Sequence, residues 1–326
     1  SFLNNRLTGT FDWYRRNTKD MLVAGATLPA TLGASVPKSN SADMKTIGWE
    51  LSLGWNDRLE NGFSYWVKGV LSDYQATITK YAGNDAGFYS QSDGDGKYYV
   101  GQKIGEIWGY HSNGLFQSDD EAATIDQSEL YAGKWGAGDV KYEDLDNDGK
   151  ITKGEETIYN PGDKSIIGNK TPRYQFGITV GFDYKNFDFE MFWQGTGKRD
   201  YMLSGAQFWG FTSQWDVPYT PALDYWTETN TDAYFPRPGW QNGGNRVTSD
   251  RYLQSAAYGR LKNLTVGYTI PKNLTTKWGI SRLRLYVTGE NLLTIAPLND
   301  AFDPETLGGI CLLYTSDAAD DRISVD

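Results

Sequence analysis

One hairpin, spanning residues 174–194, constrains the fold of this chain more than any other segment. Apolar and polar side chains alternate along both of its arms, and Lys185 and Asn186 form the turn between them. Successive side chains of a strand point to opposite faces, so one face is apolar with aromatic ends and the other is mostly polar. Phe192 is an apolar exception on the polar face. The apolar face is formed by Tyr174, Phe176, Ile178, Val180, Phe182, Tyr184, Phe187, Phe189, Met191 and Trp193.

The length and the two-faced pattern of these arms predict strands that cross a membrane. Each arm reaches or approaches the roughly 9–11 residues that a tilted strand needs to span a bilayer. A barrel wall with lipid outside and water inside requires aromatic residues at the ends of an apolar stripe and small or polar residues opposite. The sequence contains no run of about 18 apolar residues, so we expect no transmembrane helix. We therefore predict an all-β fold, an antiparallel transmembrane β-barrel segment.

Strand patterning extends through the chain, and the lengths of the connections alternate between short and long. Outer-membrane barrels have short periplasmic turns and long extracellular loops, so we expect long extracellular loops at about 24–44, 80–172 and 205–251. Because bacterial barrels have an even number of strands, at least one closing strand is expected after residue 293. The seven expected strands are 7–23, 45–55, 62–79, 173–184, 187–204, 252–270 and 281–293.

Composition excludes several classes of function. The formal net charge of −10 argues against a nucleic-acid binder, which needs a basic face. A single cysteine, Cys311, permits no internal disulfide, and with a single histidine, His111, a protein-only zinc site is not expected. No partner spacing supports His111 in Ser/His or Cys/His catalysis, so we interpret it as a loop histidine.

Both ends of the sequence suggest a fragment. Residue 1 begins no signal peptide, and strand patterning is present from residue 6, so we expect an N-terminal part to be missing. At the other end, residues 311–326 have clustered acids and no aromatic alternation. This tail resembles translated adapter sequence, and a genuine disordered tail would leave the preceding strand unpaired. We expect residues 1–310 to belong to the barrel part and residues 311–326 to be an artefact.

Short phrases in a fixed order connect this chain to a known family. They include Lys19-Asp20-Met21-Leu22, Asn113-Gly114-Leu115-Phe116-Gln117, Gly138-Asp139-Val140-Lys141-Tyr142, Ser165-Ile166-Ile167-Gly168-Asn169, Arg260-Leu261-Lys262-Asn263-Leu264-Thr265, Thr288-Gly289-Glu290-Asn291-Leu292-Leu293 and Phe302-Asp303-Pro304-Glu305. Together with the hairpin and the loop order, they resemble the C-terminal part of the SusC/RagA family of TonB-dependent outer-membrane transporters. The resemblance covers almost all of residues 1–305.

The resemblance implies a function as well as a fold. It implies about seven strands of a 22-stranded, plugged barrel that imports oligosaccharides or peptides without catalysing a reaction. It also implies a SusD-like surface lipoprotein as a lid, TonB as the source of energy, and the outer membrane of a Gram-negative bacterium as the location. The family's N-terminal accessory domain, TonB box, plug, early strands and final strand have no counterpart in the sequence. The chain by itself is therefore not expected to close, insert or transport.

Two other interpretations stay open. A secreted glycan-binding β-sandwich or a glycoside hydrolase is disfavoured by the strand lengths and the alternating connections. Asp188 and Glu190 are two residues apart, a spacing compatible with a pair of catalytic carboxylates, but a polar barrel lining predicts the same residues. The third interpretation, a TonB-dependent siderophore receptor, differs mainly in the plug and loops.

The acidic segment 144–155 fits the twelve-position calcium loop at every specified position. Alternate carboxylates converge where Gly149 permits a sharp turn, and calcium prefers such hard oxygen ligands. In the family the loop often ends on a later acid, so the resemblance adds Asp163 as a replacement for Glu155 or an addition to it. The alternative is a solvated acidic turn. The expected ligands are Asp144, Asp146, Asp148, Lys150 through its carbonyl group, and Glu155 or Asp163; the ion would stiffen the loop, and no organic cofactor is expected.

Aromatic residues crowd the connection at 205–251. Aromatic faces stack on sugar rings and anchor protein partners, so this loop is a candidate contact for substrate or for the lid. The alternative is packing within the loop, together with the aromatic girdle of a barrel. The candidate binding residues are Trp209, Trp215, Tyr219, Trp226 and Trp240.

Overall fold

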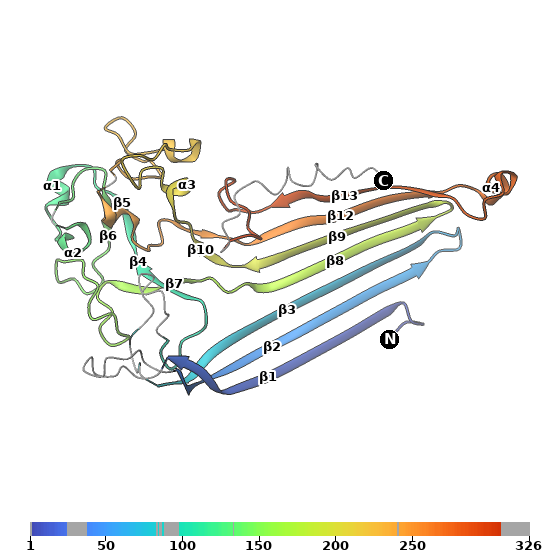
Figure 1. Ribbon diagram of the computed structural model, residues 1–326, viewed down its shortest axis with the longest axis horizontal. Helices are drawn as coiled ribbons and strands as arrows, with labels where there is room; N and C mark the ends of the chain where they lie inside the picture. Colours follow the sequence, from blue (N-terminus) through green and yellow to red (C-terminus); the bar gives the residue numbers. More distant parts are fainter. Residues whose placement is uncertain are drawn as a thin grey trace.

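The protein is dominated by one antiparallel sheet of seven strands, in the spatial order β1-β2-β3-β8-β9-β12-β13 (Figure 1). The computed structural model describes residues 2–24, 38–82, 98–132, 134–239 and 241–307, together with Asn84 and Gly87. The strands of the sheet are β1 (Leu7–Ala24), β2 (Lys38–Arg58), β3 (Ser64–Tyr81), β8 (Arg173–Tyr184), β9 (Phe187–Lys198), β12 (Tyr258–Thr269) and β13 (Arg284–Ile295).

All seven strands expected from the sequence are present. The hairpin arms β8 and β9 begin where the alternation begins, and β2 extends beyond both ends of the expected strand at 45–55. Two expected strands each divide into a long and a short strand. The short pieces, β10 (Asp200–Met202) and β11 (Leu253–Ser255), pair with each other instead of joining the large sheet. The expected tail at 311–326 lies outside the described residues.

The strand register brings the apolar stripes of the seven strands together on one face of the sheet, with Phe192 and Trp66 among the exceptions on the other face. Phe11 is 64% exposed and Val287 is 77% exposed, so the other described residues leave this face uncovered. A soluble sandwich would bury the stripe under a second sheet, whereas a barrel wall presents it to hydrocarbon. Residues paired on this face include Trp13 with Trp49, Leu71 with Phe176, Phe182 with Phe189, and Val266 with both Phe189 and Val287.

The opposite face is polar, as the alternation predicts. Asp188 and Arg284 form an ion pair across β12, with the Arg284 Nε 2.9 Å from Asp188 Oδ1. The carboxylate of Asp188 is therefore held by a guanidinium of the lining, which favours the structural interpretation over a pair of catalytic acids. Trp66 also lies on this face, across Gly181, where a Cβ atom would overlap the indole ring.

The connections differ sharply at the two ends of the sheet (Figure 1). At one end they are short, at 59–63, 185–186 and 270–283, and the last holds α4 (Lys272–Thr275) and η4 (Thr276–Trp278). At the other end, residues 98–172, 199–257 and 296–307 fold together, and we call their described residues the loop unit. No helix in the described part of the chain is long and apolar enough to cross a membrane.

The sequence patterns missed the internal structure of the loop unit. Two small sheets form within the expected loop at 80–172, where β4 pairs with β7 and β5 pairs with β6. Each strand has only three to six residues, too few for alternation to be recognised. The elements of the unit are β4 (Glu106–Tyr110), β5 (Ser112–Leu115), α1 (Asp119–Ala122), α2 (Ser128–Tyr131), β6 (Val140–Tyr142), β7 (Lys164–Asn169), β10, α3 (Ala206–Trp209), η2 (Thr220–Leu223), η3 (Gly243–Arg246) and β11.

The main apolar core lies in the loop unit and not on the sheet. All three segments of the loop unit contribute residues to this core, so the segments stabilise one another instead of folding separately. This division follows from the barrel-like sheet, whose apolar face points outward and leaves the loops to bury their own apolar surface. Its buried members are Tyr110, Leu115, Tyr131, Val140, Tyr142, Ile151, Leu203, Phe208, Trp209, Ala222, Trp226, Ala233, Phe235, Tyr252, Ala256 and Leu298.

Candidate functional site in the loop unit

The acidic segment folds into a tight turn around one carboxylate. Asp144 accepts hydrogen bonds from the backbone N–H groups of Asn147 at 2.7 Å and of Gly149 at 2.8 Å. Asn147 and Gly149 both have positive φ, at 61° and 82°, the conformation that glycine adopts without a steric penalty. Burial opposes the charge, but these hydrogen bonds outweigh it and hold the pKa of Asp144 below its usual value. The sharp turn expected at Gly149 is present.

Three carboxylates converge beside this turn. One oxygen atom each from Asp144, Asp146 and Asp163 lies within 4.8 Å of the other two. Asp163 belongs to this group although it lies 19 residues after Asp144 in the chain, whereas Glu155 is exposed and lies outside the group. Of the two acids that the sequence left open as the last ligand, the described structure therefore brings in Asp163. Asp148 belongs to the same turn and accepts from the N–H of Lys150 at 2.8 Å.

The environment of Asp163 fits a cation. Its side chain is almost completely buried, and its two oxygens accept from the N–H groups of Leu145 at 2.8 Å and Thr152 at 2.7 Å. Burial, together with the charges of Asp146 and Asp144, raises the pKa of Asp163 despite these bonds. A carboxylate has about four lone-pair sites, so both oxygens keep capacity for a metal. Closely spaced hard oxygens that repel one another are a suitable ligand set for calcium.

The aromatic candidates separate into buried and exposed residues. Trp209 and Trp226 are 8% and 7% exposed and belong to the apolar core, so they support the loop-packing interpretation. Trp215 is 83% exposed and Tyr219 is 55% exposed. Trp240 lies outside the described residues. Among the candidates that the structure describes, only Trp215 and Tyr219 are therefore available to contact a ligand or partner.

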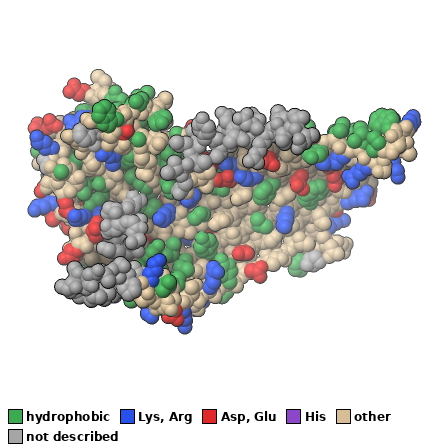
Figure 2. All heavy atoms as spheres, viewed as in Figure 1, with side chains coloured by type: hydrophobic (Ala, Val, Ile, Leu, Met, Phe, Trp, Pro, Cys, Tyr) green, Lys and Arg blue, Asp and Glu red, His purple; other side chains and the backbone are tan. Residues whose placement is uncertain are grey.

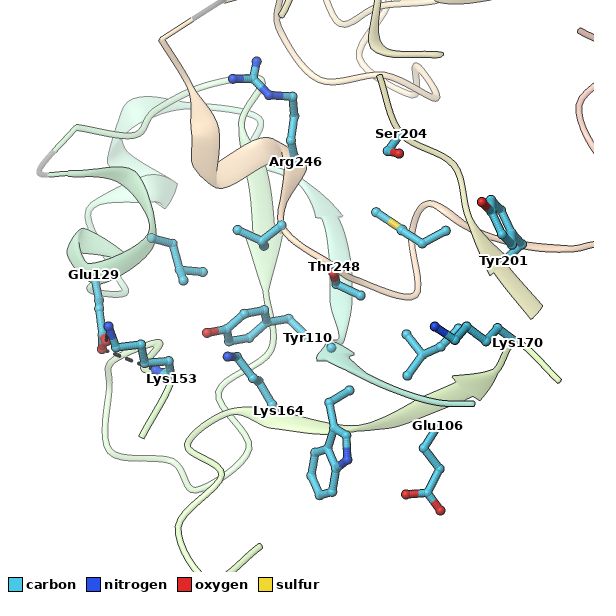
Figure 3. Close-up of a pocket in the computed structure, with 16 residues that line it drawn as sticks. Glu106, Tyr110, Glu129, Lys153, Lys164, Lys170, Tyr201, Ser204, Arg246 and Thr248 are labelled. Carbon is cyan, nitrogen blue, oxygen red and sulfur yellow. Dashed lines mark hydrogen bonds and ion pairs between the residues drawn. The ribbon is translucent and has the colours of Figure 1, made fainter. Parts of the chain in front are cut away.

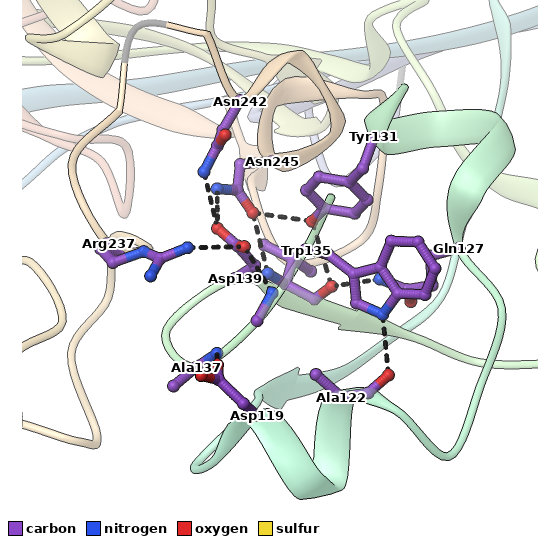
Figure 4. Close-up of polar contacts among 12 residues, drawn as sticks. Asp119, Ala122, Gln127, Tyr131, Trp135, Ala137, Asp139, Arg237, Asn242 and Asn245 are labelled. Carbon is purple, nitrogen blue, oxygen red and sulfur yellow. Dashed lines mark hydrogen bonds and ion pairs between the residues drawn. The ribbon is translucent and has the colours of Figure 1, made fainter. Parts of the chain in front are cut away.

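A buried carboxylate joins two of the long connections (Figure 4). Asp139 has no solvent exposure and accepts hydrogen bonds from the side chains of Asn242 at 2.9 Å and Asn245 at 2.8 Å. Its second oxygen accepts from Gly136 N–H at 2.9 Å and from Arg237 at 3.1 Å. Buried charges persist only when they are paired and hydrogen-bonded, and Asp139 meets both conditions.

Asn245, in the segment 199–257, extends this network to further groups of the segment 98–172. Its Oδ1 accepts from the Tyr131 hydroxyl at 2.7 Å and from the Val140 N–H at 2.8 Å. The Tyr142 hydroxyl donates to the Gly244 carbonyl at 2.6 Å. Polar bonds thus cross between the same segments that share the apolar core, and they fix one arrangement of the loops.

The segment after β13 folds back onto the polar face of the sheet. Arg260 in β12, whose side chain is 9% exposed, pairs with Asp303 at 2.8 Å and with Glu305 at 2.7 Å. Lys262 reaches Glu305 at 3.0 Å. Two of the family-like phrases, at 260–265 and 302–305, therefore meet in space. No sequence signal predicted this pairing, because the phrases are more than 35 residues apart.

Two cavities border these structures. The first, of about 570 Å³, lies in the loop unit (Figure 3). Figure 3 shows Tyr110, Lys153, Lys164 and Glu129 directed toward one another at one end of it. Burial raises the pKa of Tyr110, and the charges of Glu129 and nearby acids add to this effect, so the Tyr110 hydroxyl stays neutral.

The second cavity, of about 430 Å³, lies on the polar face. It is lined by Gln175, Phe192 and Gln194 of the hairpin and by Pro304 and Glu305 of the returning segment. Both cavities are within the roughly 300–1,000 Å³ of small-molecule sites.

His111 joins three segments of the loop unit. Its Nδ1 lies 2.7 Å from Asp250 Oδ2, and its Nε2 lies 2.7 Å from Ser165 Oγ. These groups stand in the order of a hydrolase triad, a partnership that sequence spacing could not reveal. Ser165, however, sits within β7 in register with Gly109, not on the exposed strand-to-helix turn typical of such nucleophiles. We interpret the trio as a clasp between segments.

Comparison with known proteins identifies relatives for this geometry. No family model matches the chain. TonB-dependent receptor P3 of Formosa agariphila is 29% identical over 320 residues, which cover 94% of this chain and 29% of that protein. TonB-dependent receptor SusC of Bacteroides thetaiotaomicron is 26% identical over 313 residues, covering 95% of this chain and 29% of SusC.

Solved structures agree on the fold. A structure of the RagAB peptide transporter matches with a TM-score of 0.69 and 20% identity, over 93% of this chain and 31% of the matched chain. A structure of the RagAB peptide importer in its open-open state also matches, with a TM-score of 0.69. The chain thus spans less than a third of the relatives that it matches. Sequence and fold together confirm the resemblance found in the phrases: this chain is homologous to the TonB-dependent receptors that include SusC, and its strands have their barrel fold.

Proposed function

We propose that this chain forms part of the wall and outer loops of an outer-membrane importer in a Gram-negative bacterium. The carrying observation is the two-faced sheet, with its uncovered apolar stripe opposite a polar, ion-paired face. Exposure of such a stripe to water is unfavourable in free energy, whereas contact with the hydrocarbon of a membrane is not. The names of the relatives, which are receptors and a transporter, support the same function.

The proposal extends to partners and substrate. A SusD-like lipoprotein covers the loop end, TonB supplies the energy, and the imported molecules are oligosaccharides or peptides. Support comes from the relatives SusC and the RagAB peptide transporter. Within the chain, exposed Trp215 and Tyr219 offer contacts for a lid or substrate, and the cavity beside Phe192 offers a polar, part-aromatic surface along the inner face.

A calcium ion is the proposed cofactor. Asp144, Asp146 and Asp163 would hold it, with Asp148 and the Lys150 carbonyl in the same turn. The ion would neutralise repelling carboxylates and fix the turn at the surface of the loop unit. Its role is structural, since the chemistry of transport breaks no bond in the substrate.

The test uses the full-length protein in its native host. Membrane fractionation should place the protein in the outer membrane, extractable only with detergent. Deletion of the gene should abolish growth on one glycan or peptide source and leave growth under iron limitation unchanged. A protein that is soluble without detergent would refute the proposal, and a defect confined to iron limitation would favour the siderophore alternative.

A further inference from the structure

The connection between β12 and β13, residues 270–283, differs from the other connections at its end of the sheet. It is the longest of the three, it carries α4 and η4, and it projects past the neighbouring strand ends (Figure 1). A backbone hydrogen bond of 2.8 Å from Ile270 to Leu283 continues the strand ladder into it. The connection is therefore held firmly to the barrel wall.

The charge of this connection is opposite in sign to that of the chain. It contains Lys272, Lys277 and Arg282 and no acid. The three connections at 59–63, 185–186 and 270–283 together contain four basic residues and one acid, while the whole chain has a net charge of −10. The carboxylate of Asp188 on the polar face is held by Arg284 and also interacts electrostatically with Arg282, which precedes Arg284 by two residues. Arg282 therefore belongs with the polar lining, and Lys272 and Lys277 are the basic side chains that the connection itself offers.

Apolar side chains stand beside these cations. Leu274 is 42% exposed, Trp278 is 58% exposed and Ile280 is 38% exposed. Figure 2 shows apolar and basic side chains together at this tip. The ring centroids of Phe187 and Tyr268, 4.6 Å apart, form an aromatic contact at the adjoining strand ends. The apolar surface of the connection thus adjoins the aromatic end of the stripe.

We propose that residues 272–280 dock on anionic phospholipid headgroups of the leaflet at this end of the barrel. Lys272 and Lys277 contact headgroup phosphates, and Trp278 lies in the interfacial zone where amphipathic rings are favoured. Basic side chains with interleaved apolar residues are the combination that binds anionic lipid surfaces. This inference rests on the proposed membrane location and adds a lipid preference to it.

The test measures lipid retention by the full-length protein. The protein is purified in a nonionic detergent, mixed with dioleoyl phosphatidylglycerol or dioleoyl phosphatidylcholine, and bound lipid is counted by native mass spectrometry. The preference for phosphatidylglycerol should fall on the order of fivefold for each charge removed in Lys272→Gln and Lys277→Gln. Trp278→Ala should weaken retention of both lipids.

A matched control removes two exposed lysines from the loop unit, Lys103→Gln and Lys134→Gln, and it should keep the preference. Equal retention of the two lipids by the unmodified protein, or an equal loss in the control, would overturn the inference. Insertion into liposomes is measured separately, so a protein that inserts without the preference refutes only this inference, and one that fails to insert refutes the proposed function.

Discussion

The buried carboxylate Asp139 offers the sharpest test of how the loops hold together. Replacing it in Asp139→Ala leaves two buried donors, Asn245 Nδ2 and Gly136 N–H, without their acceptor. Each such orphaned donor costs about 1–3 kcal/mol, so we expect a loss of about 2–6 kcal/mol in the stability of the loop unit. Arg237 adds little, because its side chain is 45% exposed and regains water.

Hydrogen exchange followed by mass spectrometry measures this loss in the full-length protein. A loss of about 2 kcal/mol raises the exchange rate of the β6 amides about 30-fold where they exchange by local opening. The control is Asp119→Ala, because exposed Asp119 accepts one backbone bond, from Ala137 at 2.8 Å, and should change exchange less than about fivefold. Unchanged exchange in Asp139→Ala, or equal changes in the two variants, would show that Asp139 does not join the loops.

Three further predictions concern separate parts of the molecule. Asp163→Asn should abolish calcium binding measured by isothermal titration, while Glu155→Gln should leave it unchanged, because only Asp163 lies in the carboxylate group; the reverse result would reinstate the twelve-position loop. Gly181→Ala should cost about 1–3 kcal/mol in unfolding experiments, because its Cβ would overlap the neighbouring indole, and an unchanged midpoint would place that ring elsewhere. Hydrogen bonds from Gln117 N–H and Lys141 lower the pKa of Glu121, so the ionised carboxylate stabilises the loop unit above the unfolded pKa near 4.5. This stabilisation should be lost as the pH falls through the folded pKa, and hydrogen exchange near α1 should then rise. An equal rise of exchange with falling pH in Glu121→Gln would contradict this.

Local alternation determined most of the sheet. Since side chains of a strand alternate strictly between two faces, the pattern at 174–194 fixed the bounds of β8, the start of β9 and the direction in which each side chain points. The calcium-like spacing at 144–150 predicted the turn at Gly149 for a similar reason, because all of its groups are close in sequence. The phrases predicted the family, and the relatives confirm it.

Tertiary structure decided what depends on contacts between distant segments. The sequence left Glu155 and Asp163 as alternatives, and only folding brings Asp163 to the turn. Aromatic crowding could not distinguish buried Trp226 from exposed Trp215, since burial depends on the shared core of three connections. The pairs of Arg260 and the clasp at His111 likewise join segments that no periodicity relates. Local structure follows from the spacing of neighbouring residues, whereas contacts between distant residues depend on the tertiary fold of the whole chain.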